Sequence, residues 1–142
     1  MFTIGTGTIA KGVNSFASGN ETQAYGPNSF TIGNKNNVMH KNAFIAGEGN
    51  TSTRENQFII GKYAKINTNT IFAIGDGTGT EDTNRSTILD LTSDKKLSLK
   101  ADIEFKDKIN NDKNKNTATI MFDASNNCLK FVFSSSNNSK GN

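Results

Sequence analysis

Residues 14–19 read Asn-Ser-Phe-Ala-Ser-Gly, and residues 28–33 read Asn-Ser-Phe-Thr-Ile-Gly, 14 positions later. The Phe and Gly of this unit recur in six copies along the first half of the chain without an insertion. The asparagine precedes the Phe by two positions at Asn14, Asn28, Asn42 and Asn56, and Thr70 takes its place in the last copy. A fixed spacing over six copies indicates an internal repeat, which has to be recognised before the rest of the fold is assigned. The structural repeat residues are Phe2, Phe16, Phe30, Phe44, Phe58 and Phe72, together with Gly5, Gly19, Gly33, Gly47, Gly61 and Gly75.

A weaker signal divides each unit in two. Gly12 and Gly26 follow the first two repeat glycines by seven positions. Segments of three or four residues between turn signals are too short for helices but long enough for strands. Each unit is therefore predicted to form two short strands, each followed by a turn. A row of small or apolar residues eight positions after each Phe accompanies this pattern: Ala10, Ala24, Val38, Ser52 and Ile66.

Two turns in each 14-residue unit describe one coil of a parallel β-roll, or β-solenoid. Stacked coils would be hydrogen-bonded at about 4.8 Å spacing, and the phenylalanines would form a ladder. The ladder has two possible positions, the interior of the coil or a contact with partner subunits, and the pattern does not choose between them.

The composition favours an oligomer. Hydrophobic residues make up 33% of the 142-residue chain, and even with its 13 glycines added the share stays below the usual apolar share of about 45–50%. A narrow coil lined by small residues buries little apolar area, and stacking and symmetric association both compensate for this. We expect a homo-oligomer.

The 14-residue period ends at Gly79. Alternation of apolar and polar residues over 97–106 predicts a half-buried strand, and 117–133 reads as a β-hairpin around turn-forming residues. Residues 134–142 consist of Ser, Asn, Lys and Gly, a composition typical of a disordered chain end. The expected organisation is a β-roll shaft of six units at 1–79, a small antiparallel β module at 80–133 and a disordered tail at 134–142.

Charge and cysteine content exclude several classes of protein. The formal net charge is +3 and the basic residues are scattered, whereas a nucleic-acid binder concentrates them on one face. The single cysteine, Cys128, cannot form an intrachain disulfide and is expected to be an incidental thiol. No segment has the length and apolarity of a membrane span, and the first residues do not resemble a signal peptide. Nucleic-acid binding and membrane insertion are not expected.

Residues that could carry catalysis or hold a metal are sparse. His40 is the only histidine and occupies a turn position of the repeat. The glycine-rich stretch 75–79 lacks the Lys-Ser or Lys-Thr of a phosphate loop, and the nearby Asp76, Glu81 and Asp82 lack the spacing of a calcium loop. No pair of carboxylates faces a shared groove, as a glycosidase would require. We expect no enzyme activity, no cofactor and no metal.

Residues 14–33 resemble the head repeats of trimeric autotransporter adhesins, and the resemblance extends over about residues 2–79. It implies a left-handed parallel β-roll with three chains to a head. The chain departs from that family because Phe replaces a smaller residue, and because no signal peptide, coiled-coil stalk or membrane barrel is visible.

Residues 56–63, 71–78 and 118–133 look more like fibre and tail-associated proteins of phages. The two resemblances together imply a homotrimeric head-fibre, tail-fibre or decoration protein of a phage virion that attaches to surfaces by multivalent contacts. Its implied partners are other virion proteins, of the capsid or tail, and a host-surface glycan or protein. The alternative is the head of a bacterial trimeric surface adhesin, located at the cell surface.

Overall fold

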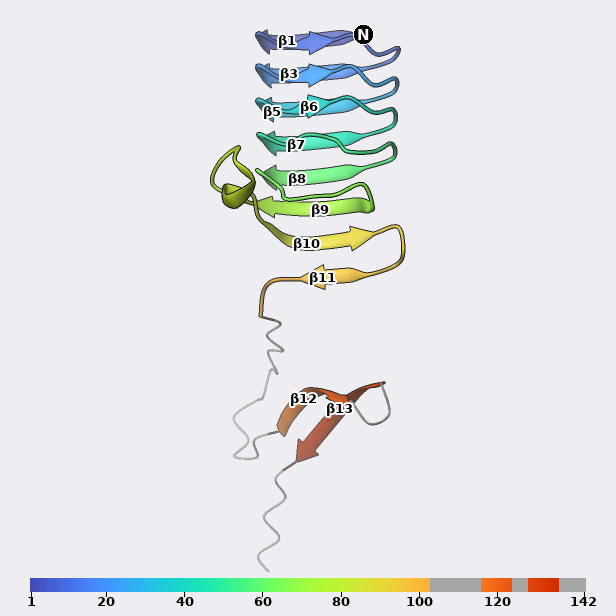
Figure 1. Ribbon diagram of the computed structural model, residues 1–142, viewed down its shortest axis with the longest axis vertical. Helices are drawn as coiled ribbons and strands as arrows, with labels where there is room; N and C mark the ends of the chain where they lie inside the picture. The colour runs from blue at the N-terminus through green and yellow to red at the C-terminus, as the bar shows by residue number, and fades with distance from the viewer. Residues whose placement is uncertain (103–115, 124–127, 136–142) are drawn as a thin grey trace, which may run out of the picture. The chain divides into compact units, whose positions relative to one another are not determined.

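Figure 1 shows the computed structural model of the chain, which describes residues 1–102, 116–123 and 128–135. The protein is all-β, with 47% strand and 3% helix, and its first part is a parallel β-solenoid with a spacing of about 14 residues. Both features confirm the predicted fold class. The chain divides into two compact units, Met1–Ala101 and Asp102–Asn142. The solenoid and the strands that continue its sheet are called the roll below.

The repeat strands of the roll lie side by side in one parallel sheet (Figure 1). Each repeat phenylalanine is paired with the phenylalanine of the next coil, and each repeat glycine with the next glycine. The repeat therefore sets the register of the sheet directly. The strands are β1 (Phe2–Thr6), β3 (Phe16–Asn20), β5 (Phe30–Asn34), β7 (Phe44–Glu48), β8 (Phe58–Lys62) and β9 (Thr70–Asp76).

Shorter strands form the opposite side of the first coils. They are β2 (Ile9–Ala10), β4 (Gln23–Ala24) and β6 (Asn37–Val38), and they make a three-stranded parallel sheet. The first three units thus contain two strands each, as predicted. In the next unit only an isolated bridge between Asn37 and Thr51 continues this ladder.

The core of the roll is the narrow space between the two sheets. Successive side chains of a strand point to opposite faces, and the residue after each phenylalanine points inward. Ile45 and Ile59 are fully buried there, opposite Val38. The phenylalanines point outward, so the ladder does not fill the coil interior. The inward row consists of Thr3, Ala17, Thr31, Ile45, Ile59 and Ala73.

Backbone conformation explains the two most regular positions of the repeat. The asparagine two residues before the phenylalanine has a left-handed φ, for example 53° at Asn28, and asparagine tolerates this better than most residues. Its side chain also donates to the asparagine of the next coil, as from Asn28 to Asn42 at 3.3 Å. Four of the repeat glycines, Gly5, Gly19, Gly33 and Gly47, have φ between 119° and 122°, in a region that residues with a side chain rarely adopt.

Inside the later coils, buried asparagine side chains form hydrogen bonds with backbone groups of the next coil. Asn50 is fully buried; its Nδ2 donates to the Gly61 carbonyl at 2.8 Å, and its Oδ1 accepts from the Ala64 amide at 2.9 Å. Asn36 makes the equivalent donation to the Gly47 carbonyl one coil earlier. These bonds give partners to the buried Ala64 amide and to partly buried carbonyls, as a narrow core requires.

Replacing Asn50 with alanine is expected to lower the free energy of unfolding by about 2–3 kcal/mol, because the buried Ala64 amide and the partly buried Gly61 carbonyl lose their partners. Urea denaturation followed by circular dichroism would measure the change. Asn20→Ala is the control, since the Asn20 side chain donates to Asn34 at an exposed position, and a loss within about 0.5 kcal/mol is expected for it. Equal losses in the two variants would contradict the structural role of Asn50.

The sheet of the roll continues beyond the repeats. After a loop that contains the short 3-10 helix η1 (Asp82–Asn84), β10 (Thr87–Thr92) pairs antiparallel with β9, and β11 (Leu97–Leu99) pairs antiparallel with β10. The first compact unit therefore ends at Ala101, whereas the repeat predicts a boundary after residue 79. The reason is that β10 forms backbone hydrogen bonds with the free edge of β9. The loss of periodicity in the sequence does not predict this pairing.

The strand predicted from alternation at 97–106 is shorter in the structure. It ends at Leu99 as β11, and the positions beyond 102 that belonged to it lie outside the described residues. The predicted hairpin is present as β12 (Asn116–Asp123) paired antiparallel with β13 (Cys128–Ser135). Because β13 extends to Ser135, the first two residues of the expected disordered tail are in a strand, and 136–142 lie outside the description.

Candidate interaction surface

The outward phenylalanines form a continuous stacked ladder. Adjacent ring centroids are 4.6–5.5 Å apart over all five steps, and the first four pairs are within 13° of parallel. Stacking shields the rings only partly: Phe2 at the end of the ladder is 56% exposed, and Phe58 within it is 40% exposed. The strands β1 to β9 that carry the rings lie one directly below another in Figure 1, so the ladder is straight.

A second apolar row runs beside the ladder, two residues further along each strand. It consists of Ile4, Ser18, Ile32, Ala46, Ile60 and Ile74. Ile4 and Ile32 are 53% and 42% exposed. Sequence reasoning missed this row because serine and alanine interrupt the isoleucines, although the shared 14-residue spacing was available as a signal.

Strands β10 and β11 extend both rows. Leu91 pairs with Phe72 and Leu97 with Leu91, which continues the phenylalanine row. Leu89 and Leu99 continue the second row in the same way. Neither row contains a charged residue across these eight strands, and seven strand spacings give a length of about 34 Å. We call this surface the apolar face; patches of such continuity mark interaction sites in proteins.

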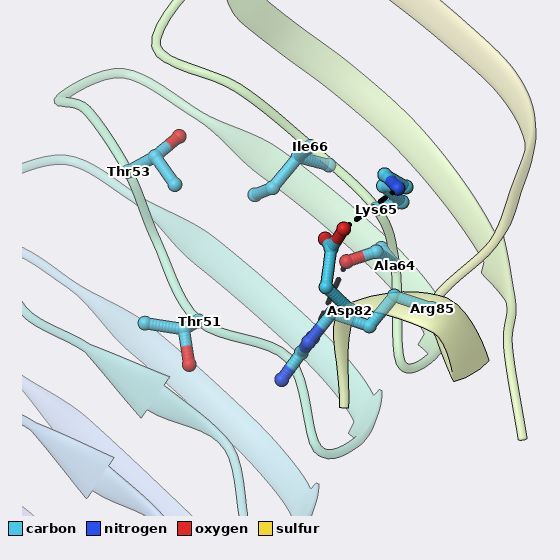
Figure 2. A pocket seen from close by; sticks show the side chains of 7 residues that line it. All are labelled: Thr51, Thr53, Ala64, Lys65, Ile66, Asp82 and Arg85. Atoms are coloured by element: carbon cyan, nitrogen blue, oxygen red, sulfur yellow. Dashed lines mark hydrogen bonds and ion pairs between the residues drawn. The ribbon is translucent and has the colours of Figure 1, made fainter. Parts of the chain in front are cut away.

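The opposite, short-strand side of the roll carries a pocket of about 240 Å³ (Figure 2). It lies where the loop after β9 folds back onto the coil that precedes it. Backbone hydrogen bonds hold this loop, from Lys65 to the Ser86 carbonyl and from Ser86 to the Tyr63 carbonyl. The lining residues are Thr51, Thr53, Ala64, Lys65, Ile66, Asp82 and Arg85.

Tyr63 lies at the corner after β8, and its hydroxyl donates to Glu48 Oε1 at 2.9 Å. That hydrogen bond is the main cause that raises the pKa of Tyr63 above its ordinary value. The folded chain thus holds the phenolic proton more tightly than the unfolded chain. The bond contributes stability below about pH 10 and loses it as the pH rises through the folded pKa.

We therefore expect the melting temperature of the wild type to fall more steeply above about pH 10 than that of Tyr63→Phe, which has no proton to lose. Thermal melts followed by circular dichroism from neutral to alkaline pH would compare the two. Parallel curves would contradict a stabilising role for the Tyr63–Glu48 bond.

Within residues 1–102, His40 and the acidic residues at 76–82 are not gathered into a site. His40 is half-buried at its turn, with Nδ1 2.9 Å from the Ser52 hydroxyl. Asp82 forms an ion pair with Lys65 Nζ at 2.9 Å. Among the described residues no three His, Cys, Asp or Glu side chains are placed to hold a metal ion. Cys128 is the first residue of β13.

The fold and this surface define a β-solenoid repeat protein with one straight apolar face. No protein-family model matches the chain, and neither curated proteins nor solved structures match it significantly. Within the part of the chain that the structure describes, no helix is long and apolar enough to cross a membrane.

Proposed function

We propose that the chain is a homotrimeric fibre or decoration protein of a phage virion, a head fibre or tail fibre, whose roll forms the shaft and which attaches to surfaces by multivalent contacts. The observation that carries the proposal is the uncharged apolar face, which spans all eight strands of the sheet. A face of this length in contact with water would favour association.

The straightness of the phenylalanine ladder supports identical copies as the partner. When copies pack with their axes parallel around a cyclic symmetry axis, each coil meets the same coil of its neighbours. Phe44 then meets Phe44 of the partner subunit, and no row is shifted along the shaft. A three-fold axis agrees with the adhesin-like repeats of residues 14–33.

Burial of the apolar face leaves the short-strand side of each subunit exposed to the surroundings. After Ile9 its outward row is polar, with Gln23, Asn37 and Thr51, and Met39 is an exposed apolar residue beside that row. Three identical outer surfaces allow weak contacts to add up when they engage together. The mechanism is therefore mechanical attachment, and no chemical step is assigned to the chain.

Two measurements test this proposal. Light scattering after size exclusion should give a mass of about three times the 15.3 kDa of one chain, and a stable monomer would overturn the trimer. Antibodies against the roll should label phage particles from the source cells in electron microscopy. Labelling of the surface of intact cells, with unlabelled particles, would instead establish the adhesin alternative.

A further inference from the structure

The pocket on the short-strand side lies at the one position of the roll where the repeat gives way to an inserted loop. Its wall on one side is the coil segment that contains Ala64, Lys65 and Ile66, and on the other side the loop that contains Asp82 and Arg85 (Figure 2). The Thr87 hydroxyl donates to the Lys65 carbonyl at 2.7 Å and adds to the backbone bonds that anchor the loop. The pocket is thus shaped by a fixed segment.

Arg85 supplies a positive charge that no carboxylate of the described residues neutralises. Its Nε donates to the Thr80 carbonyl at 3.1 Å and its Nη1 to the Ala64 carbonyl at 3.3 Å. These neutral partners hold the guanidinium in one orientation, and neither bond uses Nη2. Lys65 and Asp82 form an ion pair at 2.9 Å, so their charges cancel and the pocket keeps one positive charge. A preorganised guanidinium of this kind favours a carboxylate ligand.

The other lining groups match a ring that carries hydroxyls. The exposed Thr51 offers a hydroxyl, and the Asp82 carboxylate, whose side chain is 80% exposed, can accept from ligand hydroxyls beside its bond to Lys65. Ile66 is half-buried and gives an apolar wall. The volume of about 240 Å³ is below that of a site for a drug-sized molecule, about 300–1,000 Å³, and suits a single sugar residue.

We infer that this pocket binds an acidic sugar residue of a surface saccharide, with the sugar carboxylate on Arg85, its hydroxyls on Thr51 and Asp82, and its apolar ring face on Ile66. The inference rests on the proposed function and names the ligand class for it. Each subunit of the fibre presents one pocket on the side away from the apolar face. A saccharide with repeated acidic residues engages several pockets together, which raises the overall affinity without new contacts.

The test is a titration of the ¹⁵N-labelled full chain with methyl β-D-glucuronide, followed by chemical shifts. Methyl β-D-glucoside, which lacks the carboxylate, and acetate, which lacks the ring, are the matched ligands. Saturable shifts at Thr51, Lys65 and the Arg85 side chain are expected with the glucuronide. The affinity should fall at least about tenfold in Arg85→Gln, since a hydrogen bond to a charged group is lost.

Two further variants separate binding from folding. Thr51→Tyr fills the pocket from an exposed position and should abolish the shifts with an unchanged circular dichroism spectrum. Lys35→Gln removes a charge on another coil, where Lys35 faces Glu21 at 4.0 Å, and should bind like the wild type.

Equal affinity for the glucoside or for acetate would overturn the acidic-sugar assignment. An absence of shifts in a sample whose mass is that of a trimer would overturn the pocket but leave the fibre proposal standing. A monomeric mass would refute the fibre proposal, whatever the titration shows.

Discussion

Replacing Gly33 with alanine is expected to lower the free energy of unfolding of the roll by about 3–5 kcal/mol. Gly33 has a φ of 122°, and a Cβ built on it would lie 2.0 Å from the Gly47 carbonyl oxygen of the next coil. Both the glycine and its neighbour belong to the hydrogen-bonded sheet, so neither backbone can retreat without breaking the register. Urea denaturation at a fixed protein concentration, followed by circular dichroism, would measure the loss.

Gly79→Ala is the matched control for this substitution. Gly79 has no left-handed φ, and the atom nearest to its added Cβ would be Asn84 Cβ, in a side chain, at 3.3 Å. We expect a change within about 1 kcal/mol. If Gly33→Ala were equally mild, the close approach of successive coils at the repeat glycines would be refuted.

The 14-residue period predicted the fold and register of the roll because a parallel stack places equivalent residues of successive coils beside one another. A period in the sequence therefore becomes a row in space, and Phe16 pairs with Phe30. The hairpin was predictable for a similar local reason, since alternation on both sides of a turn specifies antiparallel strands. The roll depends on contacts at one constant separation along the chain, and the hairpin depends on contacts between two neighbouring segments.

The remaining features depend on tertiary contacts that have no period. The direction of the phenylalanines follows from the width of the coil, which accepts Ile45 and Ile59 but leaves the rings outside. Because β10 pairs antiparallel with β9, the last strand of the repeat lies inside the sheet and not at its edge. Arg85 reaches the Ala64 carbonyl only because the loop folds back, so the pocket could not be read from spacing.

Replacing Phe44 with aspartate is expected to convert the proposed trimer into monomers. Phe44 is in the middle of the ladder, stacked on Phe30 and Phe58 at 5.0 and 4.6 Å. In the trimer the substitution places one carboxylate from each subunit at the same height in a desolvated interface, and a buried unpaired charge costs about 3–5 kcal/mol. In a single chain the position is half-exposed, so the roll itself should keep its fold. Light scattering after size exclusion should show the mass fall from about three times 15.3 kDa to 15.3 kDa.

Met39→Asp introduces the same charge on the short-strand side, where Met39 is 53% exposed, and should leave the trimer intact. Phe44→Ser is a second variant that adds no charge and is therefore less disruptive to folding. It weakens the apolar contact alone, so the mass should depend on protein concentration. A full trimer in Phe44→Asp, with dissociation in Met39→Asp, would place the subunit interface on the short-strand side. The apolar face would then need a different partner, and the three pockets would be covered rather than presented.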